Sequence, residues 1–217
     1  MESKVFSQEK LIGTADLKIG DIDMGHVYGD FFPAEHYYKY VQPAVWKFWS
    51  SSKPNYGKWN SLQLNVQLDN GCFLFAEGGF TFEDSPEPKY EPKRVNIVGI
   101  DRYIIDDYFL PIEPRPFVEE PWESISIEQK IGFEHELRKE LGISNDGKSL
   151  LAFFKSNSDK HILVDFEVSA VCHDQRNDDV LFRTKKRGID KEFAVVHLTW
   201  RGSREGTGYP TVKFFTN

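Results

Sequence analysis

The sequence is poor in cysteine and contains no long apolar run. Among its 217 residues there are only two cysteines, Cys72 and Cys172. Two are too few for the disulfide framework that stabilises small secreted domains. No stretch approaches the roughly 20 apolar residues of a membrane-spanning helix, and the first residues, MESKVFSQEKLIG, lack the apolar segment of a signal peptide. We therefore expect a soluble, cytoplasmic protein with no membrane partner.

Apolar and aromatic residues make up 40% and 15% of the chain, which is enough to form a sizeable core. The formal net charge is −7, and it arises within the first 122 residues, where 19 acidic residues face 12 basic ones. Such an acidic half disfavours direct nucleic-acid binding, because phosphates are bound by lysine and arginine. It suits a basic protein partner, although a charge of this size can also simply maintain solubility.

A proline-rich segment divides the chain. Four prolines fall in the eleven residues from Pro111 to Pro121. They exclude a continuous helix or an interior strand and favour an extended, stiff connector. We predict modules over residues 1–110 and 123–217, joined by a connector over 111–122. The alternative is a single domain whose halves share one sheet, with this segment crossing its surface.

The first module is predicted to consist mainly of β-strands. Apolar and polar residues alternate from Ser61 to Leu68, which predicts one buried and one solvated face. The turn signal Asp69-Asn70-Gly71 follows, and the Phe-rich segment Cys72–Phe82 returns as the next strand. Further strands are expected at Gly13–Ile19, His26–Phe32 and Arg94–Ile100. A helix is expected near residues 34–49, interrupted or restarted at Pro43, and a short acidic helix over Asp101–Phe109.

The second module is predicted to open with a helix. Ser126 and Gln129 fit a capping box, and apolar residues then recur at helical spacing as far as Leu141. Strands are expected at Ile162–Ala170, Asp179–Thr184, Phe193–Trp200 and Thr211–Phe215. The predicted fold class is therefore α+β, with two modules that each contain a mainly antiparallel sheet and one or two packed helices.

Segments that resemble catalytic or metal-binding motifs are incomplete. Phe133–Lys139 is similar to the start of a zinc-protease helix, but Lys139 stands where the second histidine ligand is required. Cys172 and His173 are neighbours in a predicted strand, so their side chains point to opposite faces, and we expect Cys172 to be a buried, inert thiol. The histidines between residues 26 and 36 match no metal-site spacing. We predict no metal, no cofactor and no enzymatic activity.

Three pairs of adjacent acidic residues lie in or near predicted loops. A catalytic carboxylate pair needs one buried partner with a raised pKa, and the sequence gives no sign of burial for any of them. We therefore expect solvated carboxylates, which as a docking surface would suit a basic partner. The predicted partner-binding residues are Glu83, Asp84, Asp106, Asp107, Glu119 and Glu120.

Two segments carry a resemblance to known families. The pattern DDVLF from Asp178, AVVHLTW ending at Trp200, and Pro210-Thr211 resembles a small bacterial domain family of uncharacterised function, over residues 123–217. The segment Gly25–Pro33 resembles modules of bacterial immunity proteins. The second resemblance implies a cytoplasmic protein that binds and neutralises a cognate protein toxin. An acidic inhibitor would fit a basic nuclease as that toxin.

His197 lies in a predicted strand that is apolar on both faces, so we expect it to be buried in a central strand and hydrogen-bonded to a carboxylate such as Asp178 or Asp179. The competing interpretation is an enzyme with a site around His197, Asp178, Asp179 and Trp200. A third interpretation is a structural module that forms a homodimer.

Overall fold

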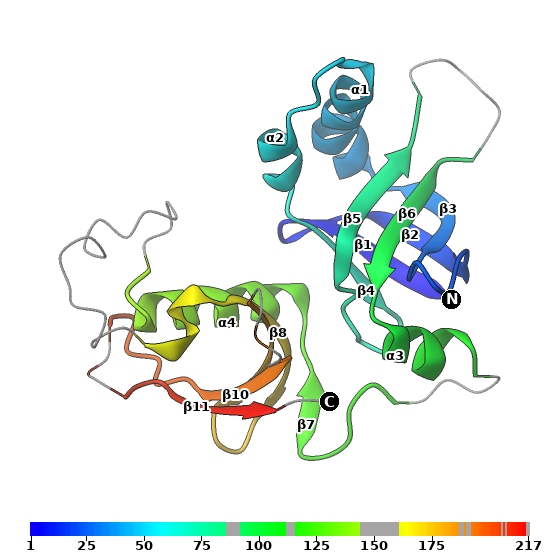
Figure 1. The fold of residues 1–217 in the computed structure, drawn as a ribbon. Coiled ribbons are helices and arrows are strands. Elements are labelled where there is room, and N and C mark those ends of the chain that lie inside the picture. The colour runs from blue at the N-terminus through cyan, green and yellow to red at the C-terminus, as the bar shows by residue number, and fades with distance from the viewer. Residues whose placement is uncertain are drawn as a thin grey trace. The chain divides into compact units, whose positions relative to one another are not determined.

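The computed structural model describes residues 1–85, 92–111, 116–143, 161–186, 189, 192–204, 206 and 208–215. The chain forms two compact units, Met1–Phe117 and Val118–Asn217, so the division falls within the predicted connector. A six-stranded antiparallel sheet lies in the first unit and a five-stranded antiparallel sheet in the second (Figure 1). The predicted α+β class is confirmed. Each described sheet is built from one unit, and independent folding of the units stays a prediction.

The sheet of the first unit has the order β4-β1-β2-β3-β6-β5. Its strands are β1 (Glu2–Ser7), β2 (Lys10–Ile19), β3 (Val27–Pro33), β4 (Leu64–Leu68), β5 (Ala76–Glu83) and β6 (Arg94–Ile100). β6 has the predicted bounds, and β2 to β5 overlap the predicted strands. β1 was not predicted, because three successive residues at its end are buried and the period of two is lost.

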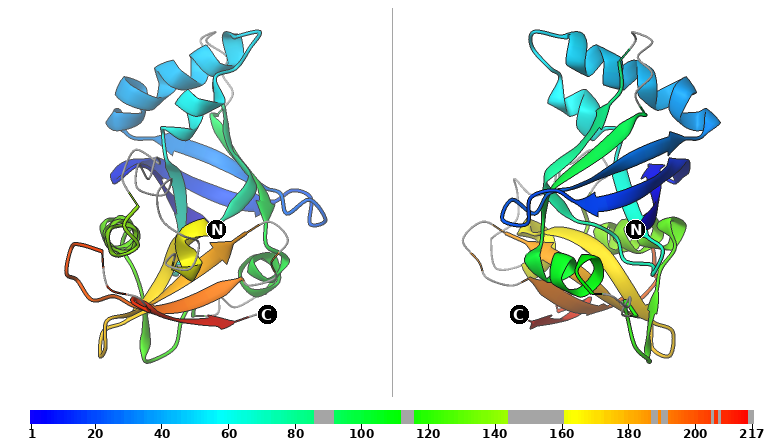
Figure 2. Two further views of the ribbon diagram at one scale, coloured as in Figure 1. Left: turned by 60° about the vertical axis from the view of Figure 1, so that its left-hand side comes forward. Right: turned by 90° about the vertical axis from the view of Figure 1, so that its right-hand side faces the viewer.

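Short helices complete the first unit. They are η1 (Tyr37–Val41), α1 (Gln42–Ser50), α2 (Tyr56–Asn60), α3 (Arg102–Ile104) and η2 (Ile105–Phe109). Pro43 lies in the first turn of α1, where its missing N–H removes no helical hydrogen bond, so the predicted restart of the helix is confirmed. In both views of Figure 2, α1 and α2 lie at one end of the sheet and α3 at the other.

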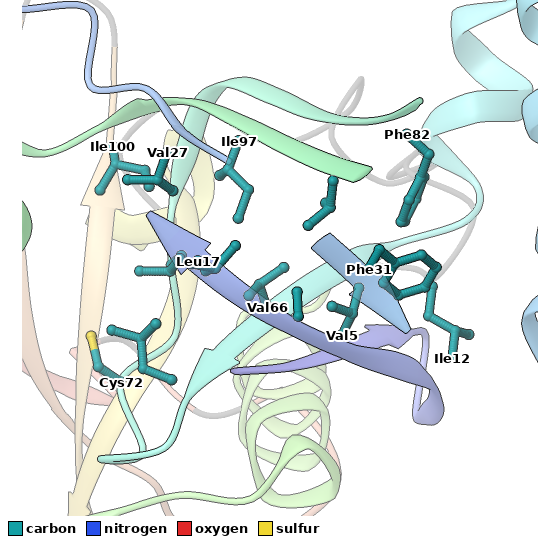
Figure 3. Close-up of a cluster of buried hydrophobic side chains, with 14 of the residues drawn as sticks. Val5, Ile12, Leu17, Val27, Phe31, Val66, Cys72, Phe82, Ile97 and Ile100 are labelled. Atoms are coloured by element: carbon teal, nitrogen blue, oxygen red, sulfur yellow. The ribbon is translucent and has the colours of Figure 1, made fainter. Parts of the chain in front are cut away.

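One face of the six-stranded sheet carries the core of the first unit. Figure 3 shows apolar side chains from several strands pointing toward one another. Phe31 packs against both Tyr37 and Phe82, with ring centroids 5.0 Å apart in each case. Cys72 is buried in this cluster. Inward residues at alternate strand positions therefore hold η1 against the sheet.

The second unit has the sheet order β11-β10-β9-β8-β7. Its elements are β7 (Trp122–Ser124), α4 (Ile127–Glu140), η4 (Ile162–Asp165), β8 (Glu167–Asp174), β9 (Asp179–Lys185), β10 (Phe193–His197) and β11 (Thr211–Phe215). α4 packs on one face of this sheet (Figure 2), where Phe133 contacts His173. The predicted capping box is confirmed: the Gln129 amide donates to Ser126 Oγ at 3.2 Å, and the Ser126 amide donates to Gln129 Oε1 at 2.9 Å.

Two predicted strands of the second unit are shorter than expected. The segment predicted from Ile162 begins as the 3-10 helix η4, which starts where His161 Nδ1 accepts a hydrogen bond from the Leu163 amide. β10 ends at His197 and does not reach Trp200. The amides of Thr199 and Trp200 donate instead to a carboxylate of α4, at 2.7 and 2.9 Å, and cannot pair in the sheet.

Candidate functional site: an acidic end of the first unit

The turn between β2 and β3 is built by an aspartate. Asp21 Oδ1 accepts hydrogen bonds from the amides of Asp23 (3.0 Å) and Met24 (3.1 Å). The amide of His26 donates to the Asp21 carbonyl at 2.8 Å and closes the turn. An aspartate that bonds to its own following backbone is a common way to stabilise such a turn. Asp21, Asp23 and Met24 are left exposed at the tip.

This turn lies directly against the end of β6. The Gly99 amide donates to the Met24 carbonyl at 3.2 Å, and the Ile100 amide donates to the Gly25 carbonyl at 3.0 Å. Gly25 has a φ of 58°, and a Cβ at this position would lie 2.3 Å from the Ile100 carbonyl oxygen. Only glycine permits this approach, so Gly25 holds the turn beside the junction of β6 and α3.

Six carboxylates gather around this junction, on the turn, on β5 and along α3 and η2. Glu77 belongs to the group because a Cβ placed on Gly99 would lie 3.1 Å from the Glu77 Cβ. Arg102 offsets one charge, since its Nε donates to Asp106 at 2.8 Å. We call this surface the acidic end; its carboxylates are Asp21, Asp23, Glu77, Asp101, Asp106 and Asp107. Figure 1 shows α3 at the end of the sheet opposite α1 and α2.

Two large apolar side chains are exposed within the acidic end. Met24 is 62% exposed at the tip of the β2–β3 turn, and Leu110 is 49% exposed directly after η2. Isolated exposed apolar residues are common on protein surfaces. Here they stand among carboxylates, so the surface offers both a negative field and apolar contact area. That combination is suited to a protein partner with basic and apolar residues.

Of the six predicted partner-binding residues, Asp106 and Asp107 belong to the acidic end. Glu83 is exposed at the end of β5 and accepts a hydrogen bond from Asn96 Nδ2 at 2.9 Å. Glu119 and Glu120 are exposed in the second unit. The predicted residues are thus divided between the two units, and their common role in partner binding stays a prediction.

Asp84 corrects the expectation of solvated acidic pairs, because its side chain has no exposed surface. It accepts hydrogen bonds from Tyr37 Oη at 2.8 Å and Gln42 Nε2 at 2.9 Å, and it forms an ion pair with Lys93. Burial acts to raise the pKa of the Asp84 carboxyl, but the hydrogen bonds from Lys93, Gln42 and Tyr37 outweigh it and lower the pKa. Asp84 is a structural residue of the first unit and offers no surface to a partner.

The predicted alternative site contains one real side-chain pair. His197 Nδ1 lies 3.0 Å from Asp179 Oδ1, as the pairing of β9 and β10 places these residues opposite each other. The His197 side chain is 48% exposed, so the expectation of a buried histidine is wrong. Alternate residues of β10 face α4 and are buried, whereas His197 is on the other face. That face is apolar at Phe193 and Val195, but it is only partly buried.

The other two residues of that site have structural roles. Asp178 has a φ of 58° in the β8–β9 turn, and its carbonyl accepts a hydrogen bond from the Leu198 amide at 3.3 Å. Trp200 also has a positive φ, and its ring packs edge-on against Phe133 with centroids 5.8 Å apart. The structure thus brings together only His197 and Asp179 as a potential acid–base pair.

The Cys172 thiol and the potential metal ligands are the remaining groups that could take part in chemistry. Burial raises the pKa of the Cys172 thiol to about 12, so this thiol is protonated and unreactive at neutral pH, as its predicted burial implied. In the part of the chain that the structure describes, no group of three or more His, Cys, Asp or Glu residues is arranged to hold a metal ion. Across the same residues, no helix has the length and apolar character needed to cross a membrane.

Sequence reasoning missed four members of the acidic end, namely Asp21, Asp23, Glu77 and Asp101. Asp21, Asp23 and Asp101 follow the ends of predicted strands, whereas Glu77 lies inside the predicted strand Cys72–Phe82. Their proximity depends on the pairing of β3 and β5 with β6, however, and that pairing has no local signal.

The chain was also compared with protein-family models, curated proteins and solved structures, and none of these gives a match.

Proposed function

We propose that this chain is a non-enzymatic protein that binds another protein, and that it neutralises a cognate bacterial toxin as an immunity protein. The observation that carries the proposal is the acidic end, whose turn also presents exposed Met24 and whose helix η2 is followed by exposed Leu110. Opposite charges accelerate the encounter of two proteins, and apolar side chains at the centre of a contact supply much of its affinity. The resemblance of Gly25–Pro33 to immunity-protein modules gives the toxin as the partner class.

A basic nuclease is the toxin that this surface would fit best. A nuclease needs lysine and arginine to bind the phosphate backbone of its substrate. A protein surface with several carboxylates can occupy the same cationic groove and exclude the nucleic acid. The turn that presents Asp21 and Asp23 is held by backbone hydrogen bonds to β6, so these carboxylates would need little ordering on binding.

The competing proposal is an enzyme, and the pair of His197 and Asp179 is the observation that favours it. A carboxylate bound to one ring nitrogen fixes the orientation of an imidazole and leaves the other nitrogen to face a substrate. The pair is partly exposed, so a substrate could reach it. In this account the acidic end would be dispensable, whereas replacing His197 by glutamine would abolish function without unfolding the protein.

The test is co-expression with the toxin encoded by an adjoining gene, scored by cell survival and by isolation of the complex. We expect the chain to protect the cell and to form a stoichiometric complex with the toxin. The fourfold variant Asp21→Asn, Asp23→Asn, Asp106→Asn and Asp107→Asn should lose protection. Asparagine keeps the acceptor oxygen on which the Asp21 turn depends, so the fold should be retained.

The matched control removes four carboxylates outside the acidic end: Glu9→Gln, Asp30→Asn and Glu35→Gln on the first unit and Glu167→Gln on the second. It should protect as well as the original chain, and so should His197→Gln. Loss of protection in His197→Gln alone would favour the enzyme. A chain that only self-associates, and forms no complex with the toxin, would favour the homodimeric module.

A further inference from the structure

The first unit contains one region of opposite charge. Residues 36–68 include four lysines and no aspartate or glutamate, although the whole chain has 34 acidic residues. This region comprises η1, α1, α2 and β4. It is also rich in aromatic residues, of which Tyr38, Tyr40, Trp49 and Tyr56 are among the most exposed large side chains. The segment that forms η1, α1 and α2 therefore carries only positive charge of its own.

A pocket of about 200 Å³ lies between α1, the segment that follows it, and α2. Three of the four lysines line it: Lys47 from α1, Lys53 from the connecting segment and Lys58 from α2. All three are exposed, and within the described ranges none of them forms an ion pair. The lining contains no carboxylate. Lysines that converge on a pocket without a counter-charge favour an anion there.

The apolar wall of the same pocket is aromatic. Phe48 and Trp59 both line it, and their ring centroids are 4.5 Å apart at an interplanar angle of 41°. Tyr56 packs edge-on against Phe48 with centroids 5.4 Å apart. Phe48 and Trp59 are only partly buried, so part of each ring surface is open to the pocket. A flat apolar group can pack on such rings.

The rim of the pocket is held by local hydrogen bonds. Asn55 Oδ1 accepts a hydrogen bond from the Lys58 amide at 2.9 Å and caps α2. Ser51 Oγ donates to the Lys53 carbonyl at 2.9 Å. These bonds fix the backbone of the segment between α1 and α2, from which the exposed lysine side chains extend.

We propose that this pocket binds a small organic anion in which a carboxylate or phosphate is attached to a flat apolar ring. The ring packs on Phe48 and Trp59, and the anionic group is bound by Lys47, Lys53 and Lys58. A volume of about 200 Å³ accommodates a single substituted ring and its anionic group. The site is independent of the proposed toxin binding, because it has the opposite charge and lies at the other end of the unit.

The test uses the full chain and follows the indole N–H signal of Trp59 by NMR during titration with phenyl phosphate and with benzoate. Inorganic phosphate and benzyl alcohol serve as the two separated parts of the ligand. We expect the linked anions to shift the Trp59 signal and to bind about tenfold or more tightly than either part, because both contacts then act in one molecule. Comparing phenyl phosphate with benzoate shows which anionic group the lysines prefer.

Two variants and one control connect the binding to the pocket. Lys47→Gln, Lys53→Gln and Lys58→Gln together should weaken binding about tenfold or more. Ala44→Phe fills the pocket and should abolish binding with the charges in place. Lys4→Gln, Lys10→Gln and Lys18→Gln remove the same charge from exposed positions elsewhere on the unit and should leave binding unchanged.

Four results would overturn the assignment. Binding of inorganic phosphate as tightly as phenyl phosphate, or of benzyl alcohol as tightly as benzoate, would reduce the site to a single contact. An equal loss of affinity in the control variant with three lysines replaced elsewhere would show that binding depends only on the overall charge of the protein. Affinity for oligothymidylate that increases with its length would identify a nucleic-acid surface instead of a small-molecule site.

Discussion

Asp84 is the residue on which one end of the first unit depends. It joins η1 through Tyr37, α1 through Gln42, and the approach to β6 through Lys93. Replacing it with asparagine removes the buried charge that balances Lys93 and leaves this partly buried ammonium without its counter-ion. We expect Asp84→Asn to lower the free energy of unfolding by about 2–4 kcal/mol, measured by urea denaturation.

The control for this substitution is Asp30→Asn. Asp30 also pairs with a cation, Arg94, but the atoms are 3.7 Å apart and the Asp30 side chain is 43% exposed. An exposed pair of this kind contributes less than about 1 kcal/mol. Equal losses in the two variants would contradict the structural role given to burial at Asp84.

The lowered pKa of Asp84 predicts how the stability of the first unit varies with pH. Because the folded pKa lies below the unfolded value of about 4, the stabilisation is fully present above that value. It is lost as the pH falls further through the folded pKa. Thermal melting between pH 6 and pH 2.5 should therefore show a smaller acid-induced loss of stability in Asp84→Asn than in the original chain. Parallel losses would show that Asp84 does not titrate in this way.

His197 is expected to contribute little to stability. Its side chain is 48% exposed, and its pair with Asp179 is accessible to solvent. His197→Ala should lower the free energy of unfolding by less than about 1 kcal/mol. The neighbouring Val196 is fully buried, and Val196→Ala should cost about 1–3 kcal/mol. If the histidine variant were the less stable of the two in chemical denaturation, the exposed placement of His197 would be wrong.

At the scale of elements, α4 holds the segment that follows β10. Glu140 Oε1 accepts hydrogen bonds from the amides of Thr199 and Trp200, and Glu136 Oε1 accepts one from the Gly202 amide at 2.7 Å. Both glutamates are buried. Glu140 also accepts a hydrogen bond from the Thr199 hydroxyl at 3.0 Å, and Glu136 forms an ion pair with Lys139 at 3.4 Å. The carboxylates of α4 thus replace the sheet pairing that ends at His197.

This contact predicts a large effect for a single substitution on α4. Glu140→Ala leaves the Thr199 and Trp200 amides without their acceptor and should cost about 2–4 kcal/mol of unfolding free energy. Glu140→Gln keeps an acceptor oxygen and should cost less. Hydrogen exchange at the Thr199 and Trp200 amides should accelerate most in the alanine variant. Unchanged exchange there would show that Glu140 does not hold this segment.

Elements whose signals are local could be predicted from the sequence. The capping box at Ser126, the restart at Pro43 and the strand Arg94–Ile100 each depend on residues within one turn or one period-two run. β1 and the end of β10 could not be predicted in the same way. In β1 three successive buried residues hide the period of two. β10 ends where a glutamate some 60 residues earlier on α4 takes over the backbone amides.

The candidate site was only partly predictable for a related reason. Asp106 and Asp107 were identified from their charge, but the sequence cannot show that the turn at Asp21 packs against β6. Asp84 stands beside Glu83 in the same polar segment, and only the folded chain places Tyr37, Gln42 and Lys93 around it. A carboxylate's charge can be read from the sequence, whereas its burial depends on contacts across the fold.

At the scale of the whole molecule, each unit has its own sheet and its own helices. We therefore expect residues 1–117 and 118–217 to fold when expressed separately. Limited proteolysis of the full chain should cut first within Pro111–Pro121, and each fragment should keep its circular dichroism spectrum and melt cooperatively. A single unfolding transition, with neither fragment folded, would show that the units depend on each other.

The charges of the first unit are separated along its length. Outside residues 36–68 this unit has 17 acidic and 8 basic residues, whereas residues 36–68 have four lysines and no acid. The acidic end and the cationic pocket are thus at opposite ends of one sheet. A basic protein approaching this field would be oriented toward the acidic end before contact.

The most direct test of this account is the association rate of the purified chain with its toxin at low and high salt. The fourfold acidic-end variant should associate roughly tenfold more slowly than the original chain at low ionic strength, and the difference should shrink as salt screens the charges. The control variant with four neutralised carboxylates elsewhere should keep nearly the original rate. Equal rates for the acidic-end and control variants at low salt would contradict the claim that the acidic end receives the partner.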